Sequence, residues 1–143
     1  MNSPGLTAPS LLYAVKRLEL VIRARLDEML RDSGVTTLQY TALTVLAHRD
    51  GISTAQLARD SFVTPQSMAD MLRPLEARGL ITREANPQSR RELLVHLTDA
   101  GRALLQEYAD AAAALEQRMT AGFSATQVTA LRAALQRAWE SLR

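Results

Sequence analysis

Two helix-start signals only eleven residues apart constrain the fold of this chain more than any other feature. Ser53 with Gln56 three residues later has the pattern of a capping box, and Thr64 followed by Pro65 has that of an N-cap with proline at the first helical position. This interval leaves room for two turns of helix and a tight connection. Apolar residues at helical spacing follow, at Met68, Met71, Leu72 and Leu75. The pattern predicts two short helices that share a small core with Leu57 and Ala58.

Gly79 is the predicted end of the second helix, and a strand-like hairpin follows it. Residues 80–84 and 93–97 have the character of strands, and Leu93, Val95 and Leu97 alternate on one face of the second. Asn86 and Pro87 turn the chain, and the tip carries Arg90 and Arg91. The predicted fold class is therefore mainly α with a small two-stranded β-wing, arranged as a winged helix-turn-helix.

Positive charge is concentrated in this region rather than spread along the chain. The 143 residues carry a formal net charge of only +2, but five arginines against two acidic residues lie between Arg73 and Arg91. A local basic surface of this kind favours contact with nucleic acid. The chain has no cysteine and two histidines, and it contains no glycine-rich phosphate loop and no H-E-x-x-H motif. We therefore predict no enzyme activity, no metal site and no cofactor.

The remaining segments have the character of a scaffold for a dimer. Residues 1–9 are rich in Ser, Pro and Gly and are expected to form a flexible arm. Residues 10–33 and 98–143 carry apolar stripes at helical spacing that exceed what residues 36–97, the reading lobe, can cover. We expect a single domain over residues 1–143 whose terminal helices pair in a two-fold homodimer. No signal peptide or long apolar run is evident, so we expect a cytoplasmic protein with no membrane contact.

The chain resembles the MarR family of bacterial transcription regulators from Ser53 to Gly101. The segment NPQSRRELLVHLTDAG is similar to the wing of that family, D-P-x-D-R-R followed by L-V-x-L-T-x-x-G, and it lies at the matching distance from the second helix. Asn86 and Ser89 replace the two aspartates of the family pattern. The resemblance implies a dimeric regulator of double-stranded DNA, usually a repressor of a palindromic operator. Such repressors are often released by a small aromatic or phenolic ligand.

The resemblance also implies which residues bind DNA. The residues that would face the major groove are Pro65, Gln66, Ser67, Asp70 and Arg73. Arg91, with Arg90 beside it, would enter the adjacent minor groove. Ser53 and Thr64, at the two helix starts, are also expected to contact DNA. The chemistry of these side chains agrees, because Gln suits adenine, Arg suits guanine, and arginine is favoured in a narrow minor groove. The ligand-binding residues stay unassigned, although Tyr13, Arg17, Tyr40 and His48 lie on helices that could border a crevice.

Several positions keep a plainer interpretation. Asp70 is expected to pair with Arg73, with contact to a cytosine amine or repulsion of wrong sites as alternatives. Arg73, Arg78 and Arg83 could be an ordinary solvated surface, and Gln66 and Ser67 simple helix-start residues. His48 is expected to favour the dipole at a helix end, with a ligand or sensor role as the alternative. His96 is expected to be exposed on the wing, with contact to a phosphate as the alternative. Pro74 is expected to kink the second helix near Arg73.

Two other functions compete with a regulated repressor. A winged helix can serve as a protein-interaction module, and a regulator can bind DNA constitutively without a ligand. The arginine-tipped wing argues against the first alternative. Salt would distinguish DNA binding from the protein-interaction module, because binding through several phosphates weakens steeply as salt rises, whereas an apolar protein interface responds little.

Overall fold

The computed structural model describes residues 10–143, so the expected arm at residues 1–9 lies outside the described residues. The chain divides into two compact units, one extending to Ala109 and the other from Asp110 to Arg143. In chain order the elements are α1 (Leu11–Met29), α2 (Thr37–His48), β1 (Ile52–Ser53), α3 (Thr54–Asp60), α4 (Pro65–Ala77), β2 (Ile81–Asn86), β3 (Ser89–Leu97), α5 (Asp99–Met119) and α6 (Ala125–Leu142). The predicted fold class, mainly helical with a small β-wing, is confirmed.

Side-chain caps fix where the helices begin. Ser10, Thr36, Ser53, Thr64 and Ser124 each accept a hydrogen bond from the backbone N–H three residues later. Such a bond satisfies one of the amide groups that a helix start leaves without an intrahelical partner. The full reciprocal box forms at Thr36 with Gln39 and at Ser124 with Gln127. The starts at Ser53 and Thr64 agree with the positions that the sequence predicts.

The core of the first unit lies between α2, α3, α4 and the sheet. Its fully buried larger side chains come from each of these elements and include Leu43, Leu46, Leu57, Met68, Leu72, Leu75, Ile81 and Val95. Burying one such side chain stabilises the fold by roughly 1.5 to 3 kcal/mol. The predicted core positions on α3 and α4 are confirmed, except that Met71 is only partly buried. Apolar packing therefore sets the position of α4.

The sheet contains one strand more than the sequence predicts. Its order is β1-β3-β2, with both pairs antiparallel, and the two-residue β1 pairs through Ile52 with Val95 and through Ser53 with Leu94. A segment this short carries no alternating pattern that could identify it. The extra strand anchors the base of the wing to the start of α3.

The passage from the wing into α5 is tightly packed. Thr98 caps α5, because its Oγ1 accepts the N–H of Gly101 at 3.0 Å, and the same hydroxyl donates to the carbonyl oxygen of Gly79. A Cβ atom at Gly101 would lie 2.3 Å from the carbonyl oxygen of Leu80, which is too close for any side chain. The first turn of α5 therefore lies directly against the turn between α4 and β2.

Large apolar surfaces remain exposed on α1 and in the second unit. Every residue of α1 is at least partly exposed, and Leu11 and Leu12 are 81% and 79% exposed. The second unit joins the end of α5 to α6 and includes an ion pair of 3.7 Å between Arg132 and Glu116, and α6 exposes Leu135, Trp139 and Leu142. Among residues 10–143, every helix is too short or too polar to cross a membrane.

Candidate nucleic-acid interface

The first turns of α4 present a row of polar side chains to solvent. Thr64 Oγ1 accepts the N–H of Ser67 at 3.1 Å, and Pro65 occupies the first turn, where a missing N–H costs nothing. The opposite face of α4 is buried by Met68, Leu72 and Leu75. Five predicted residues are consequently brought together on the exposed face: Pro65, Gln66, Ser67, Asp70 and Arg73.

Asp70 links two of its neighbours on this face. Its Oδ1 atom lies 3.4 Å from Gln66 Nε2 and 3.4 Å from Arg73 Nη2, so the predicted pairing of Asp70 with Arg73 is confirmed. The Arg73 and Asp70 side chains are 70% and 57% exposed. Pairs this exposed contribute about 0 to 1 kcal/mol. The row is therefore ordered by contacts that a bound base or phosphate can replace at small cost.

Ser53 is not part of the α4 row, because it ends β1 and caps α3. Its Oγ atom accepts the N–H of Gln56 at 3.1 Å, but the second half of the predicted capping box is wrong. The Gln56 carboxamide instead donates to Asp60 at 2.8 Å and accepts from Arg59 at 2.7 Å. Two charged partners within one turn of α3 draw this side chain away from the helix start.

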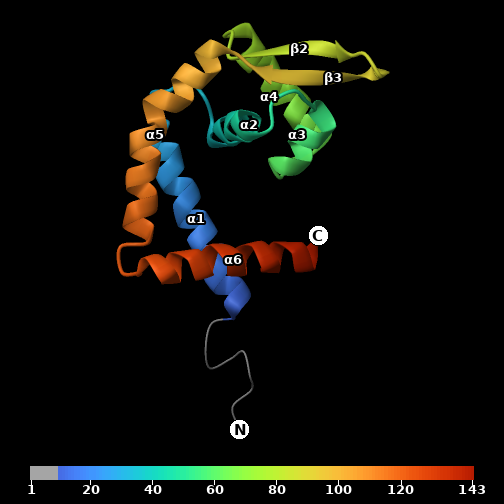
Figure 1. Ribbon diagram of the computed structural model, residues 1–143. Helices are drawn as coiled ribbons and strands as arrows, with labels where there is room; N and C mark the ends of the chain where they lie inside the picture. The colour runs from blue at the N-terminus through green and yellow to red at the C-terminus, as the bar shows by residue number, and fades with distance from the viewer. Residues whose placement is uncertain (1–9) are drawn as a thin grey trace. The chain divides into compact units, whose positions relative to one another are not determined.

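The tip of the wing carries its arginines on an unpaired bulge. Ala85 pairs with Leu93, but the next residue of β2, Asn86, pairs with Ser89, so residues 90–92 have no partner on β2. A bulge of this kind interrupts the ladder and turns its side chains outward. Arg90 and Arg91 are exposed, and neither forms an ion pair with any other described residue. Figure 1 shows the β2–β3 hairpin extending beyond α4.

Asn86 organises this tip. Its Oδ1 atom accepts the N–H of Gln88 at 2.9 Å, and its Nδ2 atom donates to Glu92 at 3.1 Å. The first bond closes a local turn of the type that asparagine and aspartate side chains both support. An amide oxygen thus closes the turn at a position where the family pattern has an aspartate, without adding negative charge beside the two arginines.

Arg78 and Arg83 form contacts within the first unit. Arg83 donates to both carboxylate oxygens of Glu76, at 2.9 and 3.3 Å, and this hydrogen bonding holds the pKa of Glu76 below its usual range. Arg78 donates to the carbonyl oxygen of Ser33 at 3.2 Å. Arg78 is exposed and Arg83 is partly buried, so the interpretation as solvated surface holds in part, but each residue also joins α4 to another part of the first unit. Arg73 alone of the three stays on the exposed face of α4.

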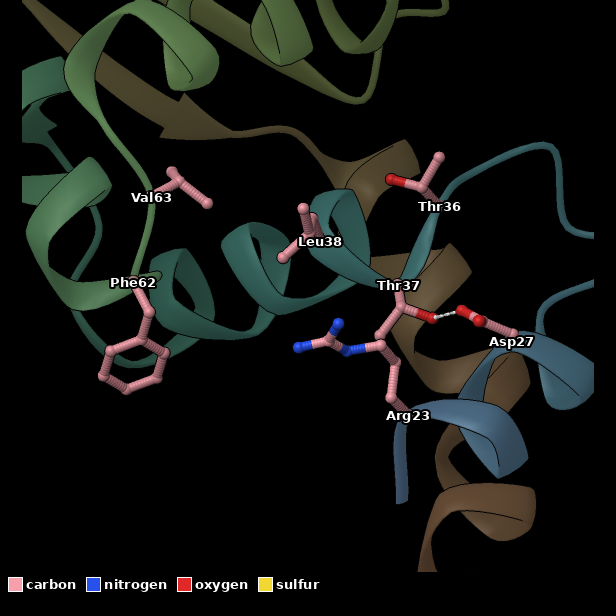
Figure 2. A pocket seen from close by; sticks show the side chains of 7 residues that line it. All are labelled: Arg23, Asp27, Thr36, Thr37, Leu38, Phe62 and Val63. Atoms are coloured by element: carbon pink, nitrogen blue, oxygen red, sulfur yellow. Dashed lines mark hydrogen bonds between the residues drawn. The ribbon is translucent and has the colours of Figure 1, made fainter. Parts of the chain in front are cut away.

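A pocket of about 400 Å³ lies beside the α3–α4 turn, between α1 and the start of α2. It is lined by Arg23, Asp27, Thr36, Thr37, Leu38, Phe62 and Val63, and Figure 2 shows the Arg23 guanidinium pointing into the space between Leu38 and Phe62. Phe62 has a φ of +63° and is 74% exposed. A left-handed backbone is strained for a bulky side chain and often marks a functional segment.

Comparison with known proteins places the chain among transcription regulators. The MarR family model, described as "MarR family", matches residues 35–93. The HTH-type transcriptional repressor Rv2887 of Mycobacterium tuberculosis is 36% identical over 115 residues, which cover 80% of this chain and 83% of the relative.

Solved structures give the same result. The repressor CouR bound to a 23-mer DNA duplex has a TM-score of 0.81 at 28% identity, with 96% of each chain covered. Rv2887 of M. tuberculosis in complex with salicylic acid has a TM-score of 0.70 at 33% identity, with 91% of this chain and 96% of that chain covered. The first neighbour holds DNA and the second holds a small aromatic acid.

Proposed function

Since this chain belongs to the MarR family of DNA-binding transcription regulators, which are not enzymes, we propose that it is a homodimeric repressor of a palindromic operator. The observation that carries the proposal is the combination of two exposed features within the first unit: the polar row on α4 and the arginine-bearing bulge of the wing. A cytoplasmic location, where the operator DNA would be, belongs to the same proposal.

The two features suit the two grooves of DNA. Gln66 can pair with an adenine edge and Arg73 with guanine once Asp70 releases it, while Ser67 can bind a base edge or a phosphate. Arg91, with Arg90 beside it, enters the adjacent minor groove, where the negative potential is concentrated. Thr64 and Pro65 set the start of the helix in the major groove, and Ser53 contacts the backbone from the start of α3.

The exposed apolar surfaces support a dimer. Residues 10–33 and 98–143 form the dimerisation helices, and residues 36–97 form the reading lobe. Leu11, Leu12 and Leu142 are each about four-fifths exposed in the single chain, and pairing with a second copy would remove these surfaces from water. A two-fold dimer would present its two reading lobes to DNA half-sites separated by about one helical turn, roughly 10 base pairs, or a multiple of it.

The pocket at Arg23 and Phe62 supports release by a small aromatic acid. Arg23 would bind the carboxylate, and Leu38, Phe62 and Val63 would contact the ring. Val63 directly precedes Thr64, the cap of α4, so a ligand here would act on the start of the recognition helix. The salicylic acid bound to Rv2887 is a ligand of this chemical class.

Selection of bound sequences from a random DNA pool tests the proposal. We expect an enriched inverted repeat, and binding of that repeat should fall steeply as salt rises. An enriched site without two-fold symmetry would rule out the palindromic operator. Failure to enrich any sequence would favour a protein-interaction module, and affinity unaffected by aromatic acids such as salicylate would favour a constitutive DNA-binding protein.

A further inference from the structure

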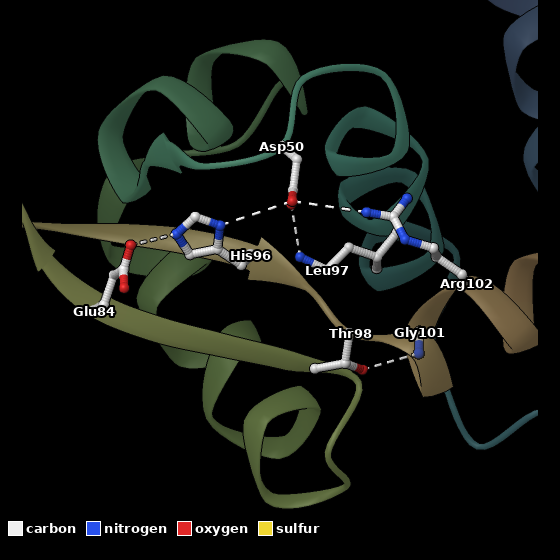
Figure 3. A network of polar contacts seen from close by, with 7 residues as sticks. All are labelled: Asp50, Glu84, His96, Leu97, Thr98, Gly101 and Arg102. Carbon is white, nitrogen blue, oxygen red and sulfur yellow. Dashed lines mark hydrogen bonds and ion pairs between the residues drawn. The ribbon is translucent and has the colours of Figure 1, made fainter.

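His96 lies between two carboxylates at the base of the wing. It is on β3, and its Nε2 atom lies 2.8 Å from Oε1 of Glu84 on β2, while its Nδ1 atom lies 3.7 Å from Oδ2 of Asp50 in the turn between α2 and β1. Figure 3 shows the ring between these two side chains. The sequence prediction that His96 is merely exposed is therefore wrong, because its side chain is 33% exposed and joins three segments of the first unit.

Asp50 fixes one side of this arrangement. Its Oδ1 atom accepts the backbone N–H of Leu97 at 2.8 Å, which attaches the end of β3 to the α2–β1 turn. Its Oδ2 atom faces both His96 Nδ1 and Arg102 Nη2 on α5, each at 3.7 Å. The His96 ring lies so close to Gly51 that a Cβ atom at Gly51 would lie 3.0 Å from His96 Cε1. The ring is thus held between fixed neighbours.

The two ring nitrogens make this site sensitive to protonation. A neutral imidazole has one N–H group and one bare nitrogen, whereas the imidazolium has two N–H groups. Ionised carboxylates accept hydrogen bonds but do not donate them. A neutral His96 that donates to Glu84 must therefore turn its lone pair toward Asp50, and only the protonated ring can attract both carboxylates.

The charges of the surrounding groups also favour the protonated ring. Asp50 and Glu84 carry one negative charge each and Arg102 carries one positive charge, so the cluster has a net charge of −1 with neutral His96 and 0 with the protonated ring. Among the described residues, these are the ionisable groups that contact His96 or its carboxylate partners. Protonation therefore both removes an uncompensated charge and joins β2 and β3 to the α2–β1 turn.

We propose that His96 is a positioning residue for the wing, whose protonation strengthens DNA binding. Glu84 lies two residues before Asn86, the residue that organises the tip, so a contact at Glu84 restrains the strand that leads to the bulge. Restraint of this strand lowers the entropy that Arg90 and Arg91 lose when they enter a groove. Histidine is the side chain that ordinarily changes charge between about pH 5 and 8, so DNA binding is compared across that range.

The inference rests on the proposed DNA-binding function, and a titration of the full-length protein tests it. Fluorescence anisotropy with the selected operator, at constant ionic strength, should give a Kd that decreases by roughly two- to fivefold between about pH 8 and about pH 6, the scale of one or two partly exposed ion pairs. His96→Gln should lose most of this change. His48→Gln removes the other histidine of the chain and should retain it.

Asp50→Asn separates a positioning role from a general loss of structure. The asparagine oxygen can still accept from Leu97, and its amide can donate to the neutral ring, so the variant should bind at about pH 8 nearly as tightly as the wild type does at about pH 6. Thermal unfolding identifies any variant that has lost its fold. Glu84→Gln is then used in place of that variant, and the Kd of this protein for the operator should depend less on pH than that of the wild type. Equal pH dependence in the wild type and in folded His96→Gln would overturn the inference while leaving the proposed function intact. Failure of the wild type to bind any DNA would overturn both.

Discussion

α4 and the tip of the wing both present polar side chains to solvent, but different contacts hold these side chains in place. α4 is seated by Met68, Leu72 and Leu75, which are fully or almost fully buried. The wing is seated at its base by Ile81, Val95 and Leu97, which are buried in the same core, and polar contacts such as that of Arg83 with Glu76 add to this attachment. Its arginines lie beyond this base, on the bulge. Apolar burial fixes an element permanently, whereas polar contacts respond to pH and salt. The polar row of α4 is therefore held by apolar burial directly beneath it, whereas the tip of the wing is held by polar contacts such as those of Asn86.

Removing apolar packing under α4 should produce the largest effect. Leu72→Ala deletes a completely buried side chain and should lower the free energy of unfolding by about 2 to 5 kcal/mol. Leu93→Ala makes the same chemical change at a wing position that is 44% exposed, and it should cost much less. Denaturant unfolding of both variants provides the measurement, and equal losses would contradict the difference drawn between helix and wing.

Removing an arginine from the bulge should affect binding but not folding. Arg91→Ala should weaken operator affinity by about 1 to 3 kcal/mol, because the side chain is exposed, takes no part in the core and is proposed to enter the minor groove. Arg91→Lys keeps the charge without the planar donor group and should give an intermediate affinity. Gel-shift titration with sedimentation measures affinity and dimerisation, and unaltered affinity would remove the wing from the interface.

Changing the exposed row of α4 should alter specificity at one position. Gln66→Ala should reduce discrimination at a single base pair by roughly 1 to 3 kcal/mol if Gln66 makes a bidentate base contact. Binding measured against a set of single-base operator variants provides the test. A uniform loss of affinity across the set would mean that Gln66 positions the helix without selecting a base.

The strained turn that precedes α4 allows a stabilising change. Phe62→Gly should raise the free energy of unfolding by about 0.5 to 1 kcal/mol, because relief of a left-handed backbone outweighs the added freedom of the unfolded chain. Phe62→Ala keeps the strain and should not stabilise. Denaturant midpoints compare the two, and a destabilised Phe62→Gly would indicate that the exposed ring contributes to packing.

The smallest effect should be a dependence of the free energy of unfolding on pH, caused by the contact of Arg83 with Glu76 at the base of the wing. Arg83 lowers the pKa of Glu76 in the folded state, so this contact stabilises the fold above the ordinary carboxyl pKa and is lost as the pH falls through the folded pKa. Glu76→Gln should therefore be less stable than the wild type at neutral pH, and the difference should shrink in acid. Thermal unfolding across that range measures it, and a constant difference would contradict the pKa assignment.

The sequence predicts local features of this molecule well and long-range features poorly. The caps at Ser53 and Thr64 depend on residues three positions apart, so their pattern is visible in the chain itself. The pairing of Ile52 with Val95 and the contact of His96 with Asp50 join residues that are distant in sequence, and no spacing rule reveals them. The bulge at residues 90–92 likewise depends on how two strands align. The assignment of individual residues to DNA stays a prediction.

The contact of Gly101 with the carbonyl oxygen of Leu80 has a mechanical consequence for regulation. Because even one methyl group at this position would force α5 away from the α4–β2 turn, the long helix cannot tilt at its first turn without displacing that turn. The same turn connects α4 to the wing. A rotation of α5 toward this turn would therefore be passed on to both α4 and the wing through a close backbone approach.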